Sequence, residues 1–229
     1  MQTAIAVVGG TGAEGSGLAL RFAKAGERVR VGSRTREKAE AAAGRLAAAI
    51  GAGEVSGHTN ADAAAGAGIV VLTVPLAAQV EILKSIRASL TPGSILVDAT
   101  VPLEVAIGGR ISRTLTLWDG SAAQQAARLA PAGVRVVAAF HGLSAEALAN
   151  LEASVDCDTL ICGDDAEAKA AVRLLAESIP GVRAVDAGPL ENARLLETAA
   201  ALLIALNLRY KVHHAGIRIT GLPAEGARG

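Results

Sequence analysis

Three glycines near the start of the chain have the spacing of a phosphate-binding turn. Gly10, Gly12 and Gly15 form the pattern G-x-G-x-x-G, which follows an apolar run at 4–8 and precedes a helix-forming segment at 18–23. In such a turn one glycine makes the bend, one admits a pyrophosphate, and one lets helix and strand pack closely. The helix start adds free N–H groups and a positive dipole end. The pattern predicts a dinucleotide site. We expect it to include the intervening residues Thr11, Ala13 and Glu14.

The residues after the second expected strand indicate which dinucleotide binds. That strand, at 28–31, ends about 20 residues beyond the glycines, where NAD-selective proteins carry an acidic residue that bonds the ribose 2′-hydroxyl. Ser33 and Arg34 stand there instead. A hydroxyl and a guanidinium can bond a 2′-phosphate that a carboxylate would repel, so the sequence favours NADP. Thr11 and Lys38 could add contacts. The alternative is that Arg34 and Lys38 are solvated surface charges.

Further candidate residues follow later strands. The carboxyl ends of parallel strands share one edge of a sheet, where ligands gather. Thr73, Val74 and Pro75 end one apolar run, Asp98 ends the next, and His141 follows a third. Each polar residue has a structural alternative. Thr73 could bond the backbone, Asp98 could cap the following loop, and His141 could be satisfied within its own loop.

The sequence carries none of the usual signatures of catalysis by side chains. It has no serine–histidine–aspartate order, no paired carboxylates at a recognisable spacing and no metal-ligand pattern. A dinucleotide site alone is compatible with an oxidoreductase and with a non-catalytic NADPH-binding sensor, which is the alternative from another functional class.

The elements that position these residues alternate between strand and helix. This order predicts a Rossmann-like, doubly wound parallel sheet covered by helices on both faces. We expect strands at 4–8, 28–31, 69–74, 94–98, 134–139, 159–162 and 182–186. We expect helices after the glycine turn, near 36–50, 77–90, 121–130, 144–152 and 166–179, and from about 192.

Two segments need a separate account. Residues 101–119 show no clear period and are expected to form a loop or lid beside the site. The stretch 198–208 is free of charge and must be covered on most sides, either within its own domain or by a second subunit, so a homodimer with Leu203 at its interface is expected. We expect a dinucleotide-binding domain over 1–142 and a smaller, partly helical domain over 143–229.

Composition excludes several classes of partner. The 229 residues have a formal net charge of +0 and only 2% aromatic residues, which argues against a nucleic acid or a membrane surface. Cys157 and Cys162 are too few for a disulfide framework, so buried thiols and a cytoplasmic location are expected. We expect neither a signal segment nor a membrane span, because the longest apolar stretch, 198–208, is too short to cross a bilayer.

Several longer motifs extend beyond the glycine turn. They are GGTGAEGSGLALRFA, the strand end VGSR, VVLTVP, ICGDD at 161–165, DAGPL at 186–190 and RYKVHHAGIRITG at 209–221. The glycine turn is common to many Rossmann proteins, whereas DAGPL together with the C-terminal motif is more specific. Over nearly its whole length the chain resembles the NADPH-dependent reductases of the deazaflavin coenzyme F420.

The resemblance implies a function and a second pocket. Members of that family pass a hydride between NADP(H) and F420, with C4 of the nicotinamide beside C5 of the deazaflavin. It assigns Thr11, Ser33 and Arg34 to the 2′-phosphate, residues 73–75 to the nicotinamide, and His141 to the deazaflavin. There the imidazole would donate a hydrogen bond to a ring oxygen.

The chain departs from the family pattern after His141. Gly142, Leu143 and Ser144 replace bulkier or proline-containing sequence, so another acceptor, such as a flavin or an imine, is the alternative second substrate. Three cations near the C-terminus are either solvated or could attract the anionic tail of the deazaflavin: Arg209, Lys211 and Arg218.

Overall fold

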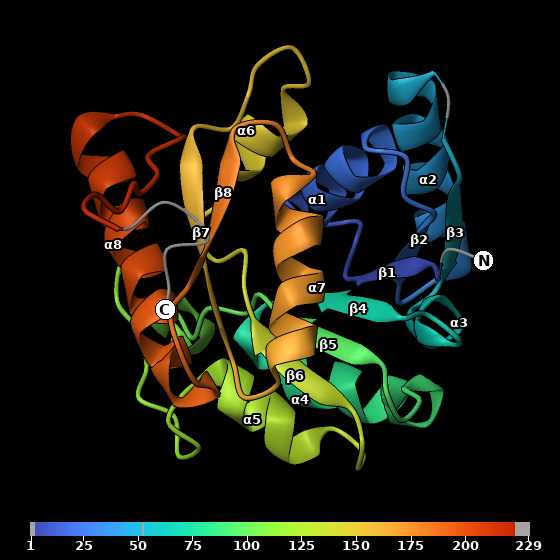
Figure 1. Cartoon of the computed structure of the whole chain (residues 1–229), viewed down its shortest axis with the longest axis horizontal. Helices are drawn as coiled ribbons and strands as arrows, with labels where there is room; N and C mark the ends of the chain where they lie inside the picture. The colour runs from blue at the N-terminus through green and yellow to red at the C-terminus, as the bar shows by residue number, and fades with distance from the viewer. Residues whose placement is uncertain (1–2, 52, 223–229) are drawn as a thin grey trace.

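A computed structural model of the protein describes residues 3–51 and 53–222. The outer ends of the two expected domains, 1–2 and 223–229, lie outside the described residues, as does residue 52. Within them a single sheet of eight strands runs through the molecule in the order β3-β2-β1-β4-β5-β6-β7-β8. In Figure 1, β3 lies at one side of the molecule and α8 at the other.

The strands are short and mostly parallel. They are β1 (Ile5–Val8), β2 (Val29–Ser33), β3 (Val55–Thr59), β4 (Ile69–Leu72), β5 (Ile95–Asp98), β6 (Arg135–Ala138), β7 (Cys157–Gly163) and β8 (Val182–Asp186). Strands β1 to β6 pair in parallel, so their carboxyl ends reach one edge of the sheet. The β6–β7 pair is antiparallel, with Ala138 opposite Cys162, and β8 runs parallel to β7.

Helices cover both faces because successive strand residues point to opposite sides. In β1, Ile5 and Val7 enter one hydrophobic cluster, whereas Ala6 and Val8 enter another. The first cluster includes α1 (Ala13–Lys24), α2 (Arg36–Ile50), α6 (Ala145–Ala149) and α7 (Ala166–Glu177). The second includes α3 (Asn60–Ala64), α4 (Leu76–Ile86) and α5 (Ala122–Leu129). A third joins α5 to α8 (Ala193–Tyr210). Short 3₁₀ helices are η1 (Arg87–Ser89), η2 (Glu104–Ile107) and η3 (Leu190–Asn192).

The structure confirms the Rossmann-like alternation and corrects two details. Strand β3 and helix α3 were not predicted, because Val55–Thr59 is a partly exposed edge strand whose sequence, VSGHT, has no apolar run. The expectation of an entirely parallel sheet was wrong at β7. The chain turns back after β6, and α6 packs on α1 rather than crossing a face of the sheet, so β7 runs in the opposite direction.

Other expectations have simpler outcomes. Both cysteines are free and buried, and burial raises the pKa of each thiol, that of Cys162 to about 12, which makes them unreactive at neutral pH. None of the helices within 3–51 and 53–222 is long and apolar enough to cross a membrane. The sheet continues across residue 142 through the β6–β7 pair, and the division into two domains there stays a prediction.

Candidate functional site

A cavity of about 630 Å³ opens at the carboxyl edge of the parallel strands. Its walls bring together Gly12–Gly15 from the glycine turn, Thr73–Pro75 from the end of β4, and His141 from the segment after β6. Val101 and Leu103 of the unpatterned segment add apolar surface, and Leu203 of α8 closes the far side. Segments that are far apart in sequence thus meet around one space of ligand size.

The glycine turn fits tightly between its neighbours. A Cβ atom on Gly15 would lie 2.5 Å from Thr73 Oγ1 and 2.8 Å from the Cα atom of Gly10, so a side chain has no room there. The Gly10 N–H donates to the carbonyl of Gly32 at 3.0 Å, which ties the turn to β2. Gly12 precedes α1 and provides no side-chain cap, so the first N–H groups of this helix are available to an anion.

Thr73 makes the backbone hydrogen bond that the sequence offered as one alternative, and it also lies at the cavity, as the other alternative required. Its hydroxyl donates to the Val8 carbonyl at 3.1 Å, and the residue also lines the cavity. Val74 and Pro75 continue the same wall into the start of α4. The predicted nicotinamide residues therefore adjoin the glycine turn through the β1–β4 pair.

The residues predicted for the 2′-phosphate are not among those that line this cavity: Ser33 and Arg34 lie at the end of β2, Lys38 in α2 and Thr11 in the glycine turn. Ser33 is buried, whereas Thr11, Arg34 and Lys38 are exposed. Among the described residues neither Arg34 nor Lys38 makes a hydrogen bond or ion pair, while their neighbour Arg36 is bonded to Asp62 at 2.7 Å. The two unpaired cations stand beside the strand that adjoins the glycine turn, where a bound dinucleotide would extend its adenosine end.

His141 follows a residue with strained backbone. Phe140 has φ of 74°, which non-glycine residues rarely adopt, and its N–H donates to Thr159 Oγ1 at 3.2 Å. Its ring packs edge-on against Phe22, with 5.8 Å between centroids. Because Phe140 is fully buried and held by these two contacts, it fixes the backbone direction at His141.

The imidazole of His141 has both nitrogens shielded from solvent and, among the described residues, neither makes a hydrogen bond. Burial lowers the pKa of His141 to about 4, although the nearby backbone of Thr100 opposes the shift. The ring is therefore neutral at physiological pH, with one N–H to donate. The backbone group that acts on the ring, that of Thr100, follows β5 and does not belong to the loop of His141, so the structure does not show the bond within that loop that the sequence offered as the alternative.

Asp98, at the end of β5, belongs to a hydrogen-bonded network rather than to the cavity wall. It is fully buried, accepts from the Thr100 N–H at 2.9 Å, and receives the Gln79 amide at 2.7 Å. Burial raises the pKa of Asp98 to about 7. This is the loop cap that the sequence offered as the alternative.

Glu197 is a buried acid that sequence reasoning missed. Located on α8, it accepts the first N–H groups of α5, those of Ala122 and Ala123, at 3.1 Å each. Burial raises the pKa of its carboxyl to about 8. A single acidic residue next to a long charge-free helical stretch was the available signal for a buried anchor.

Glu14 is an acid with a shielded carboxyl oxygen, and it lines the cavity. The residue is half-buried as a whole, but its Oε1 atom is shielded and has no hydrogen-bond partner among the described residues. Burial raises the pKa of Glu14 to about 8, and the nearby Asp98 carboxyl acts in the same direction. Within the part of the chain that the structure describes, no group of acidic, histidine or cysteine side chains could hold a metal ion.

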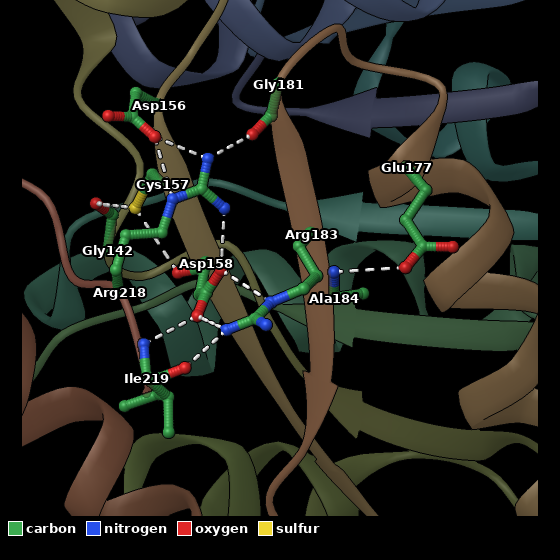
Figure 2. Close-up of polar contacts among 10 residues, drawn as sticks. All are labelled: Gly142, Asp156, Cys157, Asp158, Glu177, Gly181, Arg183, Ala184, Arg218 and Ile219. Atoms are coloured by element: carbon green, nitrogen blue, oxygen red, sulfur yellow. Dashed lines mark hydrogen bonds and ion pairs between the residues drawn. The ribbon is translucent and has the colours of Figure 1, made fainter. Parts of the chain in front are cut away.

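An ion-pair cluster holds the C-terminal segment beside the cavity (Figure 2). The buried Asp158 of β7 accepts from Arg183 Nε at 3.0 Å, Arg218 Nη1 at 2.8 Å and the Ile219 N–H at 2.7 Å. Burial alone would raise the pKa of Asp158, but these donors outweigh it and lower the pKa to about 2. Arg218 also pairs with Asp156, so it is a structural cation and not a free attractant for an anionic tail.

The residues just before this ion-pair cluster form part of the cavity wall. The hydroxyl of Ser144 donates to the His213 carbonyl at 2.7 Å, and the Ala215 N–H donates to Asn207 Oδ1 at 3.0 Å. His213 and Ala215 both line the cavity. Arg209 and Lys211 are exposed at the end of α8.

Arg21 connects α1 to the opposite side of the cavity. It is buried, and its guanidinium donates to four backbone carbonyls at the end of α6 and in the turn that follows: those of Ala147, Leu148, Asn150 and Ala153. Nothing in the sequence separates this arginine from the other helical cations. Its role becomes visible only when α6 is placed against α1.

Helix α8 has one covered face and one exposed face. Leu203 is 6% exposed and lines the cavity, so it is not the surface residue that the expected subunit interface requires. Leu195 and Leu202 are 53% and 56% exposed on the opposite side. The chain therefore covers only part of the charge-free stretch.

Comparisons with known proteins relate this chain to one family of oxidoreductases. Residues 4–102 match the family model described as NADP oxidoreductase coenzyme F420-dependent. An F420-dependent NADP reductase of Methanothermobacter thermautotrophicus is 52% identical over 98% of both chains. That of Methanocaldococcus jannaschii is 41% identical over 95% of this chain and 98% of its own. A solved structure from Arthrobacter sp. FB24, assigned as a candidate F420-dependent NADP-reductase, has a TM-score of 0.82 at 27% identity and covers 96% and 100% of the two chains.

Proposed function

Because the chain belongs to the family of F420-dependent NADP reductases, we propose that it transfers a hydride between NADP(H) and coenzyme F420. The observation that carries this proposal is the cavity in which the glycine turn, the end of β4 and the unpartnered imidazole of His141 face one another. Two ligands can meet there with little solvent between them.

The dinucleotide residues fit NADP in two respects. The first turn of α1, which Gly12 leaves without a side-chain cap, has backbone N–H groups open to a pyrophosphate, and a Cβ on Gly15 would fill the space. Next to the glycine turn, the unpaired cations beside β2 suit a 2′-phosphate. The proposed contacts to that phosphate are Thr11, Ser33, Arg34 and Lys38.

The second half of the cavity fits a planar, largely apolar ring. Thr73, Val74 and Pro75 would orient the nicotinamide, and His141 would donate its N–H to an oxygen of the deazaflavin. That hydrogen bond becomes stronger as negative charge develops on the accepting ring. The two coenzymes supply the hydride chemistry when bound, and the protein aligns them and excludes water.

Turnover with defined acceptors tests the proposal. Purified protein is mixed with NADPH and oxidised F420, FMN or a cyclic imine, and nicotinamide absorbance is followed. Turnover with F420 alone supports the proposal, turnover with another acceptor indicates a different reductase, and binding without turnover indicates a sensor. Gly15→Val is the inactive control, since its Cβ would lie 2.5 Å from Thr73 Oγ1.

We propose further that the protein works in the cytoplasm as a homodimer, with residues 143–229 completing the deazaflavin pocket. The two free, buried thiols are compatible with a reducing compartment. The exposed apolar face of α8, with Leu195 and Leu202, supports a two-fold contact between copies of the chain.

Light scattering tests the dimer. Leu202→Glu should produce monomers, because an unpaired carboxylate in an apolar contact is strongly unfavourable. Leu174→Glu is the matched control, since Leu174 is 72% exposed on α7, away from α8. A monomeric unmodified protein would rule the dimer out.

A further inference from the structure

Buried polar atoms without partners are concentrated at the cavity. Among the described residues such side-chain atoms occur in Glu14, Arg135 and His141, and two of these three residues line the cavity. Burying a carboxyl without a hydrogen bond is costly, so the surrounding fold must maintain it. His141 has a role in the proposed function, whereas Glu14 has none.

The position of Glu14 fixes what it would meet. It belongs to the first turn of α1, between Gly12 and Gly15, and it lines the cavity together with Thr73 at the end of β4. A dinucleotide in a doubly wound sheet extends from the end of β2, across the start of α1, towards β4 and β5. The carboxyl therefore lies on the nicotinamide side of the glycine turn.

We propose that Glu14 is a redox-linked proton site, whose carboxyl keeps its proton beside the uncharged dihydronicotinamide of NADPH and releases it beside the positively charged nicotinamide of NADP⁺. This rests on the NADP half of the proposed function and not on the identity of the hydride acceptor. The nicotinamide ring gains one positive charge when the hydride leaves, and a buried carboxyl nearby responds to that charge.

The proton balance is simple. When NADP⁺ binds, the O–H bond of Glu14 breaks and the proton goes to water. During reduction of an acceptor by NADPH, both electrons travel with the hydride, and Glu14 releases a proton as the reduced acceptor takes one up. The carboxylate regains its proton from solvent when NADP⁺ leaves, because the residue is partly exposed.

Because no cation among the described residues faces Glu14, the charge of the nicotinamide ring determines whether its carboxyl is protonated. The Asp98 carboxyl of β5 raises the pKa of Glu14, Glu197 of α8 has a pKa of about 8 and is itself mostly protonated near neutral pH, His141 is neutral, and Glu146 of α6 is exposed on the cavity rim. Glu14 therefore has no cationic partner among the described residues that would hold it ionised. Its pKa of about 8 keeps it protonated at neutral pH. An opposite charge within about 4–6 Å lowers a carboxyl pKa by about 1–3 units, which is enough to reverse this.

Proton counting during binding tests the proposal without any acceptor. Calorimetric titrations with NADP⁺ and NADPH near pH 7, in two buffers of different ionisation enthalpy, give the protons exchanged in each case. We expect NADP⁺ to release about one proton more than NADPH. Both nucleotides carry the 2′-phosphate, so its own ionisation cancels in the difference.

Two isosteric variants assign the proton. Glu14→Gln should abolish the difference, whereas Glu146→Gln should preserve it. In the unmodified protein, NADP⁺ affinity should rise about threefold to tenfold between about pH 6.5 and about pH 7.5 relative to NADPH affinity, and this change should vanish in Glu14→Gln. Equal proton exchange with both nucleotides, or a difference that persists in Glu14→Gln, would overturn the proposal. A chain that shows the difference but fails to reduce F420 would contradict only the proposed acceptor.

Discussion

The two walls of the cavity are built in different ways. The glycine-turn wall comes from consecutive residues, 9–15, and its conformation is fixed by backbone contacts such as the Gly10–Gly32 hydrogen bond. The opposite wall combines the segment after β6, α8 and residues 213–215, and depends on side chains such as Asp158 and Ser144. The shape of the glycine-turn wall therefore follows from its local backbone conformation. The shape of the opposite wall depends on hydrogen bonds and ion pairs between distant segments, several of them made by the buried Asp158.

Removing the anchor of the assembled wall should have the largest effect. Asp158→Ala removes the buried acceptor of two arginines that are themselves 43% and 40% exposed, and should reduce the free energy of unfolding by about 1.5–3 kcal/mol. Affinity for the deazaflavin should fall more than affinity for NADP⁺, which the other wall binds. Urea unfolding and calorimetry provide the two measurements.

The control lies two residues away. Asp156 pairs with Arg218 but is 85% exposed, so Asp156→Ala should change stability by about 1 kcal/mol or less. Equal losses in the two variants would mean that the buried cluster does not hold this wall.

His141→Ala tests the proposed contact between the same wall and the reacting ring of the deazaflavin. Single-turnover hydride transfer from NADPH should slow about tenfold to a thousandfold, the range between loss of one hydrogen bond and loss of a preorganised donor. NADPH affinity should stay nearly unchanged. Unaltered transfer would return His141 to a structural role.

Arg34→Ala tests the dinucleotide side. Loss of a charge-assisted hydrogen bond should weaken NADPH binding about tenfold to a hundredfold, with little effect on NADH. Arg36→Ala is the matched control, because that guanidinium is already paired with Asp62 at 2.7 Å. Equal affinity of the unmodified protein for NADPH and NADH would contradict the assignment.

The free energy of unfolding should depend on pH in opposite ways for two buried acids, Glu197 and Asp158. Burial raises the pKa of Glu197 from 4.5 to about 8, so the folded state holds a proton that the unfolded state loses, and stability falls as pH rises towards 8. Asp158, with its pKa lowered from 3.8 to about 2, acts in the opposite sense and loses its contribution as pH falls through 2.

Glu197→Gln provides the measurement. Between about pH 6 and about pH 7 the unmodified protein should lose about 1 kcal/mol in its free energy of unfolding from this group, and the variant should lose less. Denaturant titrations at the two pH values determine both slopes. Identical slopes would show that Glu197 is ionised throughout.

The same contrast explains what the sequence could predict. Glycine spacing and apolar runs are local, so the turn, most of the strands and the strand ends at Thr73 and Asp98 were accessible. The roles of Arg21 and Glu197 were not, since each depends on a helix from a distant part of the chain. Strand β3 was missed because an edge strand needs no apolar alternation.

The four carbonyl contacts of Arg21 have a consequence for the spacing of the two coenzymes. Helix α1 starts at the glycine turn, and Arg21, about 12 Å along its axis from Ala13, holds the turn that follows the second pocket. Hydride donor and acceptor react only when their atoms are about 3–3.5 Å apart. In the proposed function, one rigid helix therefore sets the separation between the two coenzymes. A change at Arg21 would alter the distance between the hydride donor and acceptor atoms more than the affinity for either coenzyme.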